Sequence, residues 1–110
     1  MKQVTLTTQT QRSLKLDLTE TAIERVRGLF AVDMQSVDGL WIKPCNSVHT
    51  FAMKYLIDLI YLDKEQRIIK IVPGMPTWRL SMACSAHSVI ELKEGLAAHY
   101  NLKVGHVLKL

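Results

Sequence analysis

Cysteine is scarce in this sequence of 110 residues, which holds two, Cys45 and Cys84. Two cysteines are too few for the disulfide framework that stabilises many small secreted domains. Residues 1–6 alternate polar and apolar side chains and lack the apolar core of a secretory signal. We therefore expect a cytoplasmic protein whose cysteines are thiols.

Long hydrophobic runs are also missing. The longest, residues 55–62, is interrupted by Asp58 and is far shorter than the roughly 20 residues of a membrane-spanning helix. The chain shows no repeat, low-complexity segment or linker, and its 48% hydrophobic and 22% charged residues are typical of a packed domain. We expect one domain over residues 1–110 and no membrane partner.

Dense basic clusters are absent as well. The 14 Lys and Arg residues outnumber the 10 Asp and Glu residues and give a net charge of +4, but they are dispersed along the chain. The closest pairs are Arg25 with Arg27 and Lys64 with Arg67. A protein that tracks a nucleic-acid backbone usually carries a denser cluster. The charge therefore predicts a solvated surface, and we expect no nucleic-acid partner.

The most frequent pattern in the sequence is the alternation of polar and apolar residues, which is typical of half-buried strands. It predicts a hairpin over residues 1–18 with its turn around residues 9–11. Thr21 and Glu24 then have the spacing of a capping box, and apolar residues recur at helical intervals after them. A short helix is predicted over residues 21–30.

The middle of the chain predicts three further strands. Residues 39–42 read as a buried strand that ends before Pro44, which lacks a backbone N–H. Residues 55–62 and 67–72 are rich in Ile, Leu and Tyr and predict a hairpin. In its turn Gln66 stands where glycine would be comfortable, so a positive φ there would cost about 1 kcal/mol.

The C-terminal part predicts mixed structure. Residues 73–76 should break regular structure, and a long irregular passage should lead to a strand at 88–92. A short helix at 95–100, with Asn101 in a left-handed conformation, and a last strand at 107–110 follow. Together the elements predict a β-rich α+β fold, a compact single-domain β-barrel or sandwich-like fold with two short helices.

Cys45 and His49 suggest a nucleophile and its base, in which the imidazole activates the thiol. Residues four apart in an extended strand are about 13 Å apart, so the two side chains meet only if residues 46–48 form a turn. The structural alternative is a buried cysteine beside a hydrogen-bonded histidine.

A metal site is a further interpretation, because Cys45, His49, Cys84 and His87 form two Cys–His pairs of the ligand types that zinc prefers. The spacing is not that of the usual zinc knuckles, and a domain this apolar does not need a metal to fold. We expect no metal and no cofactor.

Asp58 shares a predicted strand face with Ile60 and Leu62, and a carboxylate in an apolar row requires a partner. Arg79 is the cation to test first. The carboxylate is then either a structural group, paired with Arg79 or with loop amides, or part of a polar pocket. Trp78 would stack on a ligand in that pocket, or would pack in the core.

Several motifs in this order and spacing resemble the DUF192 family of bacterial and archaeal proteins over about residues 20–108. The most specific is Ser-Val-His-Thr-Phe-Ala-Met at residues 47–53. The further matches are Arg-Val-Arg-Gly-Leu-Phe at 25–30, Gly-Leu-Trp-Ile-Lys-Pro-Cys at 39–45, Ile57-Asp58, Tyr61-Leu62-Asp63, Trp78-Arg79, Val-Ile-Glu-Leu at 89–92 and Val104-Gly105.

The resemblance implies one small β-barrel or sandwich-like domain in a family named for its unknown function. The matching positions that would form a shared site or a shared structural network are Cys45, Ser47, His49, Thr50, Met53, Asp58, Trp78 and Arg79. Cys84 and His87 do not match, which weakens the zinc interpretation. His106 stands where the family has an aspartate, so its chemistry matters if it lies near the motif residues.

Our hypothesis is a cytoplasmic binding domain with a small polar pocket, or a protein-contact site, around the His49 loop, Asp58 and Trp78-Arg79. Because Arg79 is the cation best placed for recognition, we expect a small anionic ligand or a protein partner. One alternative is a small enzyme with Cys45 as nucleophile or His49 and Asp58 as an acid/base pair. The other is a structural or oligomerising module, which predicts that His49, Asp58 and Arg79 are buried and mutually bonded.

Overall fold

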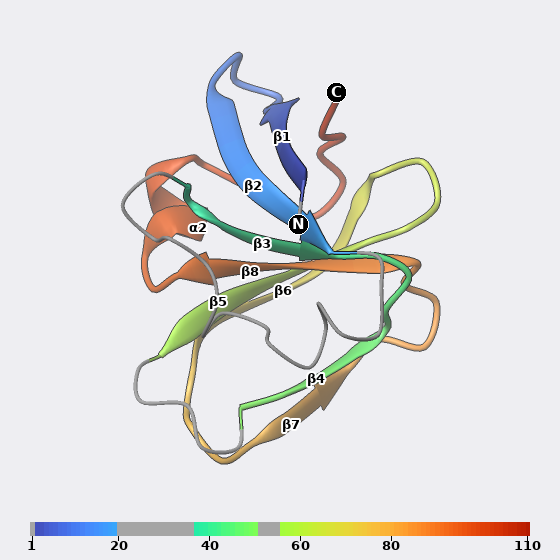
Figure 1. The fold of residues 1–110 in the computed structure, drawn as a ribbon, viewed down its shortest axis with the longest axis vertical. Coiled ribbons are helices and arrows are strands. Elements are labelled where there is room, and N and C mark those ends of the chain that lie inside the picture. The colour runs from blue at the N-terminus through green and yellow to red at the C-terminus, as the bar shows by residue number, and fades with distance from the viewer. Residues whose placement is uncertain (1, 20–36, 51–55) are drawn as a thin grey trace.

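The computed structural model describes residues 2–19, 37–50 and 56–110. The strands are β1 Lys2–Thr7, β2 Ser13–Thr19, β3 Gly39–Ile42, β4 Ser47–His49, β5 Ile57–Leu62, β6 Ile68–Met75, β7 Leu80–Met82 and β8 Ser88–Lys93, and the helix is α2 Leu96–His99. Six strands form a sheet in the order β1-β2-β3-β8-β5-β6, and β4 pairs with β7 in a second sheet. The two sheets form separate layers, with α2 on the far side of the larger one (Figure 1).

The N-terminal hairpin follows from the alternation in the sequence. β1 and β2 pair antiparallel with Leu6 opposite Leu14. Leu6, Leu14 and Leu16 are buried, and the side chains between them face outward. Gln11 lies in the turn with a φ of 66°. The predicted hairpin is confirmed, while the predicted helix at 21–30 lies outside the described residues.

Strands β3, β5 and β8 form the centre of the larger sheet, and every residue of β3 and β5 is buried. A strand covered on both faces needs a nearly continuous apolar run, which both segments supply. Gly39 is required by the close approach of β3 and β8, because a Cβ there would collide with the carbonyl oxygen of Glu91. The sequence prediction of these three strands is confirmed.

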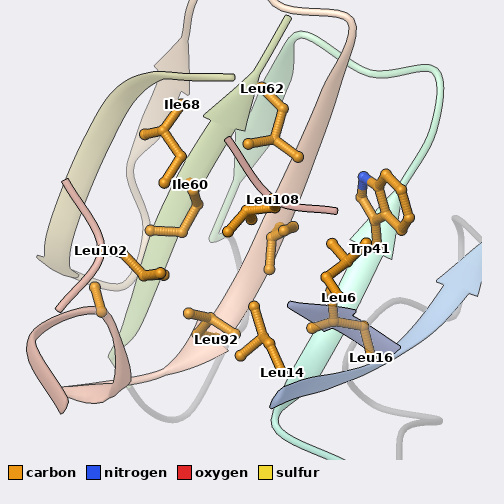
Figure 2. Packing of buried hydrophobic residues seen from close by; sticks show 12 residues of the cluster. Leu6, Leu14, Leu16, Trp41, Ile60, Leu62, Ile68, Leu92, Leu102 and Leu108 are labelled. Atoms are coloured by element: carbon orange, nitrogen blue, oxygen red, sulfur yellow. The ribbon is translucent and has the colours of Figure 1, made fainter. Parts of the chain in front are cut away.

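The larger sheet carries a hydrophobic core on each face. Because side chains alternate along a strand, the neighbours Leu59 and Ile60 belong to different cores. The first core, covered by α2 and the C-terminal tail (Figure 2), contains Leu6, Leu14, Leu16, Trp41, Ile60, Leu62, Ile68, Ile90, Leu92, Ala97, Leu102 and Leu108. The second core, which includes Val48 of the smaller sheet, contains Leu40, Ile42, Val48, Ile57, Leu59, Tyr61, Met75 and Val89.

The described strands do not close into a barrel, which was one of the two forms predicted. β1 and β6 remain the outer strands of the larger sheet. The C-terminal tail lies between them and makes two isolated bridges, Thr7 with Lys109 and Arg67 with Val107. Each bridge joins the tail to a different part of the sheet, so the tail forms no continuous ladder with any strand. The strand predicted at 107–110 is therefore absent from the described structure.

β6 runs through Pro73 and Gly74, where the sequence predicted a break at 73–76. Proline is tolerated on an edge strand, because part of its N–H row has no ladder partner. Gly74 adopts a φ of 55° beside a register irregularity between Ile57 and Leu59 of β5. The strand therefore bends at this point instead of ending.

The smaller sheet corrects the predicted irregular passage before residue 88. In β7, Leu80 and Met82 are exposed, while Ser81 points inward and accepts a hydrogen bond from the Tyr61 hydroxyl at 2.9 Å. This apolar-out, polar-in order is the reverse of an ordinary half-buried strand. The alternation that reveals strands elsewhere in the chain therefore gave no signal here.

The short C-terminal helix is confirmed. α2 follows Gly95, which has a φ of 90°, and Asn101 after it has the predicted left-handed conformation with a φ of 55°. Gln66, at the position where the sequence would favour glycine, has a positive φ of 63°. The described residues thus form a β-rich fold with one short helix, and none of their helices is long and apolar enough to cross a membrane.

Candidate functional site

Asp58 is a buried structural acceptor. Its side chain is 1% exposed and faces the first core. One carboxylate oxygen accepts the N–H of Gly74 at 2.8 Å, and the other accepts the N–H groups of Gly95 and Ala97 at 3.0 Å each. The carboxylate thus ties the bend in β6 to the start of α2, as the loop-amide alternative predicted.

Arg79 does not pair with this carboxylate. It is exposed, and its guanidinium donates to the carbonyl of Trp78 at 3.3 Å. The larger sheet separates the two groups, because Asp58 lies on the face covered by α2 whereas Arg79 directly precedes β7 on the other side (Figure 1). Within the described residues, the pocket that would combine Asp58 with Arg79 is therefore not formed.

Thr50 holds the turn that presents Trp78 and Arg79. It is fully buried, and its hydroxyl donates to the Pro76 carbonyl at 2.7 Å while accepting the Arg79 N–H at 2.9 Å. Its backbone N–H donates to Arg79 and its carbonyl accepts from Trp78. Trp78 has a φ of 60°, which is strained for a bulky residue. These bonds fix the backbone of the Trp-Arg pair.

An exposed apolar stripe follows this turn. Trp78 is 61% exposed, Leu80 67% and Met82 53%. Across the ladder, His49 lies opposite Leu80 and Ser47 opposite Met82, and both are exposed. We call the surface formed by Trp78, Arg79, Leu80, Met82, Ser47 and His49 the β7 face. Its three large apolar side chains, Trp78, Leu80 and Met82, lie within five consecutive residues, whereas exposed apolar residues of an ordinary surface are scattered singly.

The chain around the β7 face carries no carboxylates. Residues 39–57 and 66–90 contain no Asp or Glu, whereas they contain five Lys or Arg residues: Lys43, Lys54, Arg67, Lys70 and Arg79. Lys70 is exposed and its ammonium donates to the carbonyl of Met82 at 2.8 Å. Arg79 and Lys70 are thus exposed cations beside β7, although the basic residues look dispersed when the sequence is scanned for clusters.

Cys45 lies at the other end of this layer, beside an open hollow of about 260 Å³ lined by Pro44, Cys45, Asn46, Ala86 and His87. The Cys45 thiol donates to the carbonyl of Ser47 at 3.0 Å, and its backbone N–H donates to the carbonyl of His87 at 2.9 Å. Residues 47–49 are extended in β4, where the nucleophile-and-base interpretation required residues 46–48 to form a turn.

The structure describes the other predicted site residues with one exception, Met53. His49 and Arg79 are exposed, so the burial that the structural-module alternative required is wrong for both. No three His, Cys, Asp or Glu side chains among the described residues come together as metal ligands. His106 lies at the start of β6, where its carbonyl accepts the Ile68 N–H, while the Trp78 turn follows the end of β6. Met53 lies outside the described residues.

Glu91 is a buried carboxylic acid that sequence reasoning missed. It is 7% exposed, and its ladder neighbours in β3 and β5 are Leu40 and Leu59. Burial raises its pKa to about 7. Burial also raises the pKa of the Tyr61 phenol, with smaller contributions from Ser81, which lowers it, and from Cys45 and Glu91. The sequence signal for this buried acid is one acidic residue within the apolar strand β8. Because the rest of that strand has an ordinary pattern, the sequence analysis did not single out Glu91.

The family and structure comparisons agree with this fold. The model of the DUF192 family, described as "Uncharacterized ACR", matches residues 4–110. A crystal structure of a protein of unknown function from Novosphingobium aromaticivorans is similar with a TM-score of 0.80 and 20% identity, over 98% of this chain and 84% of that one. A proposed transcription regulator from Sinorhizobium meliloti 1021 is similar with a TM-score of 0.80 and 17% identity, over 97% and 91%.

No curated protein matches the chain. At 20% and 17% identity the two solved structures show a shared fold and nothing about activity.

Proposed function

Because the chain belongs to the DUF192 family, whose description names no function, we propose that it is a binding domain and that the β7 face is its contact surface. The partner is a protein segment that carries acidic and apolar side chains. This takes the protein-contact form of the hypothesis raised by the sequence, with Asp58 as a structural support of the fold and not a ligand group.

The exposed stripe of Trp78, Leu80 and Met82 is the observation that carries the proposal. Each of these side chains that a partner buries would contribute roughly 1.5–3 kcal/mol to the free energy of binding. Tryptophan and arginine are the residue types most enriched among the dominant contacts of protein interfaces. The bonds of Thr50 fix the backbone that carries both residues before a partner arrives, which lowers the backbone entropy lost on binding.

The charge of the layer selects the kind of partner. Arg79 and Lys70 are exposed cations beside the apolar stripe, and residues 66–90 hold no carboxylate to repel an anion. Complementary charge steers association and disfavours basic partners. An acidic segment with aromatic or aliphatic side chains matches both the cations and the stripe.

A protein segment fits the surface better than a small anion does. The hollow of about 260 Å³ is lined by Cys45, Asn46 and His87 with Pro44 and Ala86, and neither Arg79 nor Trp78 lines it. The exposed side chains of Leu80 and Met82 lie along β7 on its solvent side. Apolar contacts spread over a strand suit an extended partner chain.

Selection from a random-peptide display library on the immobilised full chain tests the proposal. A Trp78→Gly, Leu80→Ser double variant serves as the counter-selection target, since glycine accepts the positive φ at residue 78. We expect enrichment of peptides that combine Asp or Glu with aromatic or aliphatic residues. Their affinity should fall about tenfold or more in the double variant.

The matched control is Val104→Ser. Val104 is 63% exposed, like the residues of the stripe, but lies on the tail near the start of β6. This variant should keep the affinity of the wild type. Peptides that bind the double variant equally well, or a single-stranded oligonucleotide that binds more tightly than any selected peptide, would contradict the proposal.

A further inference from the structure

We propose that the partner of the β7 face binds as a third strand of the smaller sheet, antiparallel to β7 and along the edge of β7 that faces away from β4. The inference rests on the proposed function and deepens it, because it specifies the backbone conformation of the partner and the order of its side chains. The bound segment has an acidic residue between two apolar residues.

Main-chain hydrogen bonds fix how β7 is oriented in the smaller sheet. The Thr50 N–H donates to the Arg79 carbonyl, and the Ala83 N–H donates to the Asn46 carbonyl, both at 2.9 Å. Bonded and non-bonded pairs alternate along an antiparallel ladder, so the bonded pair between these two contains Ser81. The main-chain groups of Ser81 therefore point toward β4, and those of its two neighbours in β7 point away from β4.

The outer edge of β7 consists of the N–H and C=O groups of Leu80 and Met82, whose side chains are both exposed. Among the described residues, only Lys70 bonds one of these four groups, because its ammonium donates to the Met82 carbonyl at 2.8 Å. β7 also lies at the border of the molecule in Figure 1. Three main-chain groups are thus available to an added strand, which is how extended peptides join an exposed sheet edge.

The alternation of side chains along an added strand defines the sequence of the partner. Partner residues opposite Leu80 and Met82 point to the same side as these two, because cross-strand neighbours share a face of the sheet. Apolar side chains suit both positions, since they contact the exposed stripe. The partner residue between them lies opposite Ser81 and points inward, as Ser81 does.

Lys70 gives this inward position its preference for a negative charge. Its ammonium lies 5.7 Å from the centre of the Tyr61 ring, and the Tyr61 hydroxyl donates to Ser81 on the inner side of β7. Lys70 is exposed, so a carboxylate opposite Ser81 can approach it. An ammonium attracts a carboxylate more strongly than a neutral carbonyl. Lys70 then leaves the Met82 carbonyl to an N–H of the partner.

Backbone N-methylation of one peptide selected on the β7 face tests the added strand, with affinity for the full chain measured by calorimetry. Methylation of the two apolar residues opposite Leu80 and Met82 should lower the affinity about tenfold or more, since it removes a donor and blocks the edge. Methylation of the acidic residue between them should cost less than about threefold, because its N–H points away from β7.

Amide hydrogen exchange, followed by NMR, observes the same edge from the side of the protein. With the unmodified peptide bound, the amides of Leu80 and Met82 should exchange about tenfold or more slowly. The Ser81 amide is the matched control, because it already bonds across the ladder to β4 and should change much less. Unchanged exchange at Leu80 and Met82 would overturn the inference.

Lys70→Gln separates recognition of the partner from simple protection of the edge. We expect it to weaken binding of the acidic peptide about threefold or more, while Lys15→Gln, the same charge change at an exposed position of β2, has less effect. A lysine that only shields the edge from pairing predicts the opposite. Tighter binding by Lys70→Gln would therefore contradict the inference.

The failure of the binding mode and the failure of the proposed function give different results. A peptide that requires Trp78 and Leu80 but tolerates N-methylation at every position overturns the added strand and leaves the β7 face as the contact surface. If the selection yields no peptide that requires these two residues, both the proposed function and the added strand are wrong.

Discussion

Glu91 lies in the second core with a pKa raised by burial from 4.5 to about 7. The native protein therefore holds a proton on this carboxyl between about pH 4.5 and 7, where the unfolded chain does not. The associated stability is fully present below pH 4.5 and is lost as the pH rises through 7. A shift of this size corresponds to about 3 kcal/mol at most.

Glu91→Gln should remove this pH dependence. The amide is neutral at every pH, so we expect the variant to be more stable than the wild type near pH 8 and to differ much less near pH 5. Urea unfolding followed over that pH range measures the effect. Glu94→Gln is the matched control, since Glu94 is exposed and adjacent to β8. Parallel pH profiles for wild type and Glu91→Gln would contradict this account of Glu91.

Thr50→Val should loosen the Trp78 turn. The substitution keeps the size of a fully buried side chain but removes the hydroxyl that bonds Pro76 and Arg79. Buried groups left without a partner cost roughly 1–3 kcal/mol, so thermal unfolding should show a clearly lower Tm. Thr5→Val, on an exposed position of β1, should leave the Tm nearly unchanged. An unaltered Tm for Thr50→Val would mean that these bonds do not hold the turn.

At the scale of elements, Asp58 joins β5, β6 and α2. An amide at this position offers one acceptor oxygen where the carboxylate offers two. Asp58→Asn should therefore weaken the bonds to Gly74, Gly95 and Ala97 and lower the free energy of unfolding by roughly 2–4 kcal/mol.

Hydrogen exchange should show where the Asp58→Asn effect acts, with faster exchange at the amides of Gly95 and Ala97. The control is Asp63→Asn, because Asp63 accepts the N–H groups of Glu65 and Arg67 in an exposed turn. It should lose much less stability. Exchange that is unchanged at α2 in Asp58→Asn would show that the helix start does not depend on this carboxylate.

The elements that the sequence predicts well are those with strong local signals. Leu14 and Leu16 in alternation, or the positive φ of Gln66 and Asn101, depend on neighbours in the chain. β7 lacked such a signal because its apolar side chains face outward. The bend at Gly74 was likewise mistaken for a break, because an edge position tolerates proline only in the context of the assembled sheet.

At the scale of the whole molecule, the larger sheet divides the predicted site residues. Sequence order places Asp58 between the His49 loop and Trp78, and alternation gives its strand face. Neither the sequence order nor the alternation shows that this face of the strand points toward α2 and away from Arg79. The motif residues that do meet, Thr50 with Trp78 and Arg79, meet through backbone and hydroxyl bonds that no linear pattern reveals.

The smaller sheet lies in a part of the sequence without acidic residues. Its strands β4 and β7 belong to the segments 39–57 and 66–90, which contain Lys and Arg but no Asp or Glu. Binding of an acidic segment to the β7 face should therefore weaken as salt rises, because salt screens exposed charges. An affinity independent of salt would contradict the assigned role of Arg79 and Lys70.

Calorimetric titration of one selected acidic peptide into wild type, Trp78→Gly and Val104→Ser most directly tests the β7 face as the contact surface. The account predicts that Trp78→Gly keeps the Tm of the wild type and loses about tenfold or more in affinity, while Val104→Ser loses neither. Equal affinity of the wild type and Trp78→Gly for that peptide would contradict it.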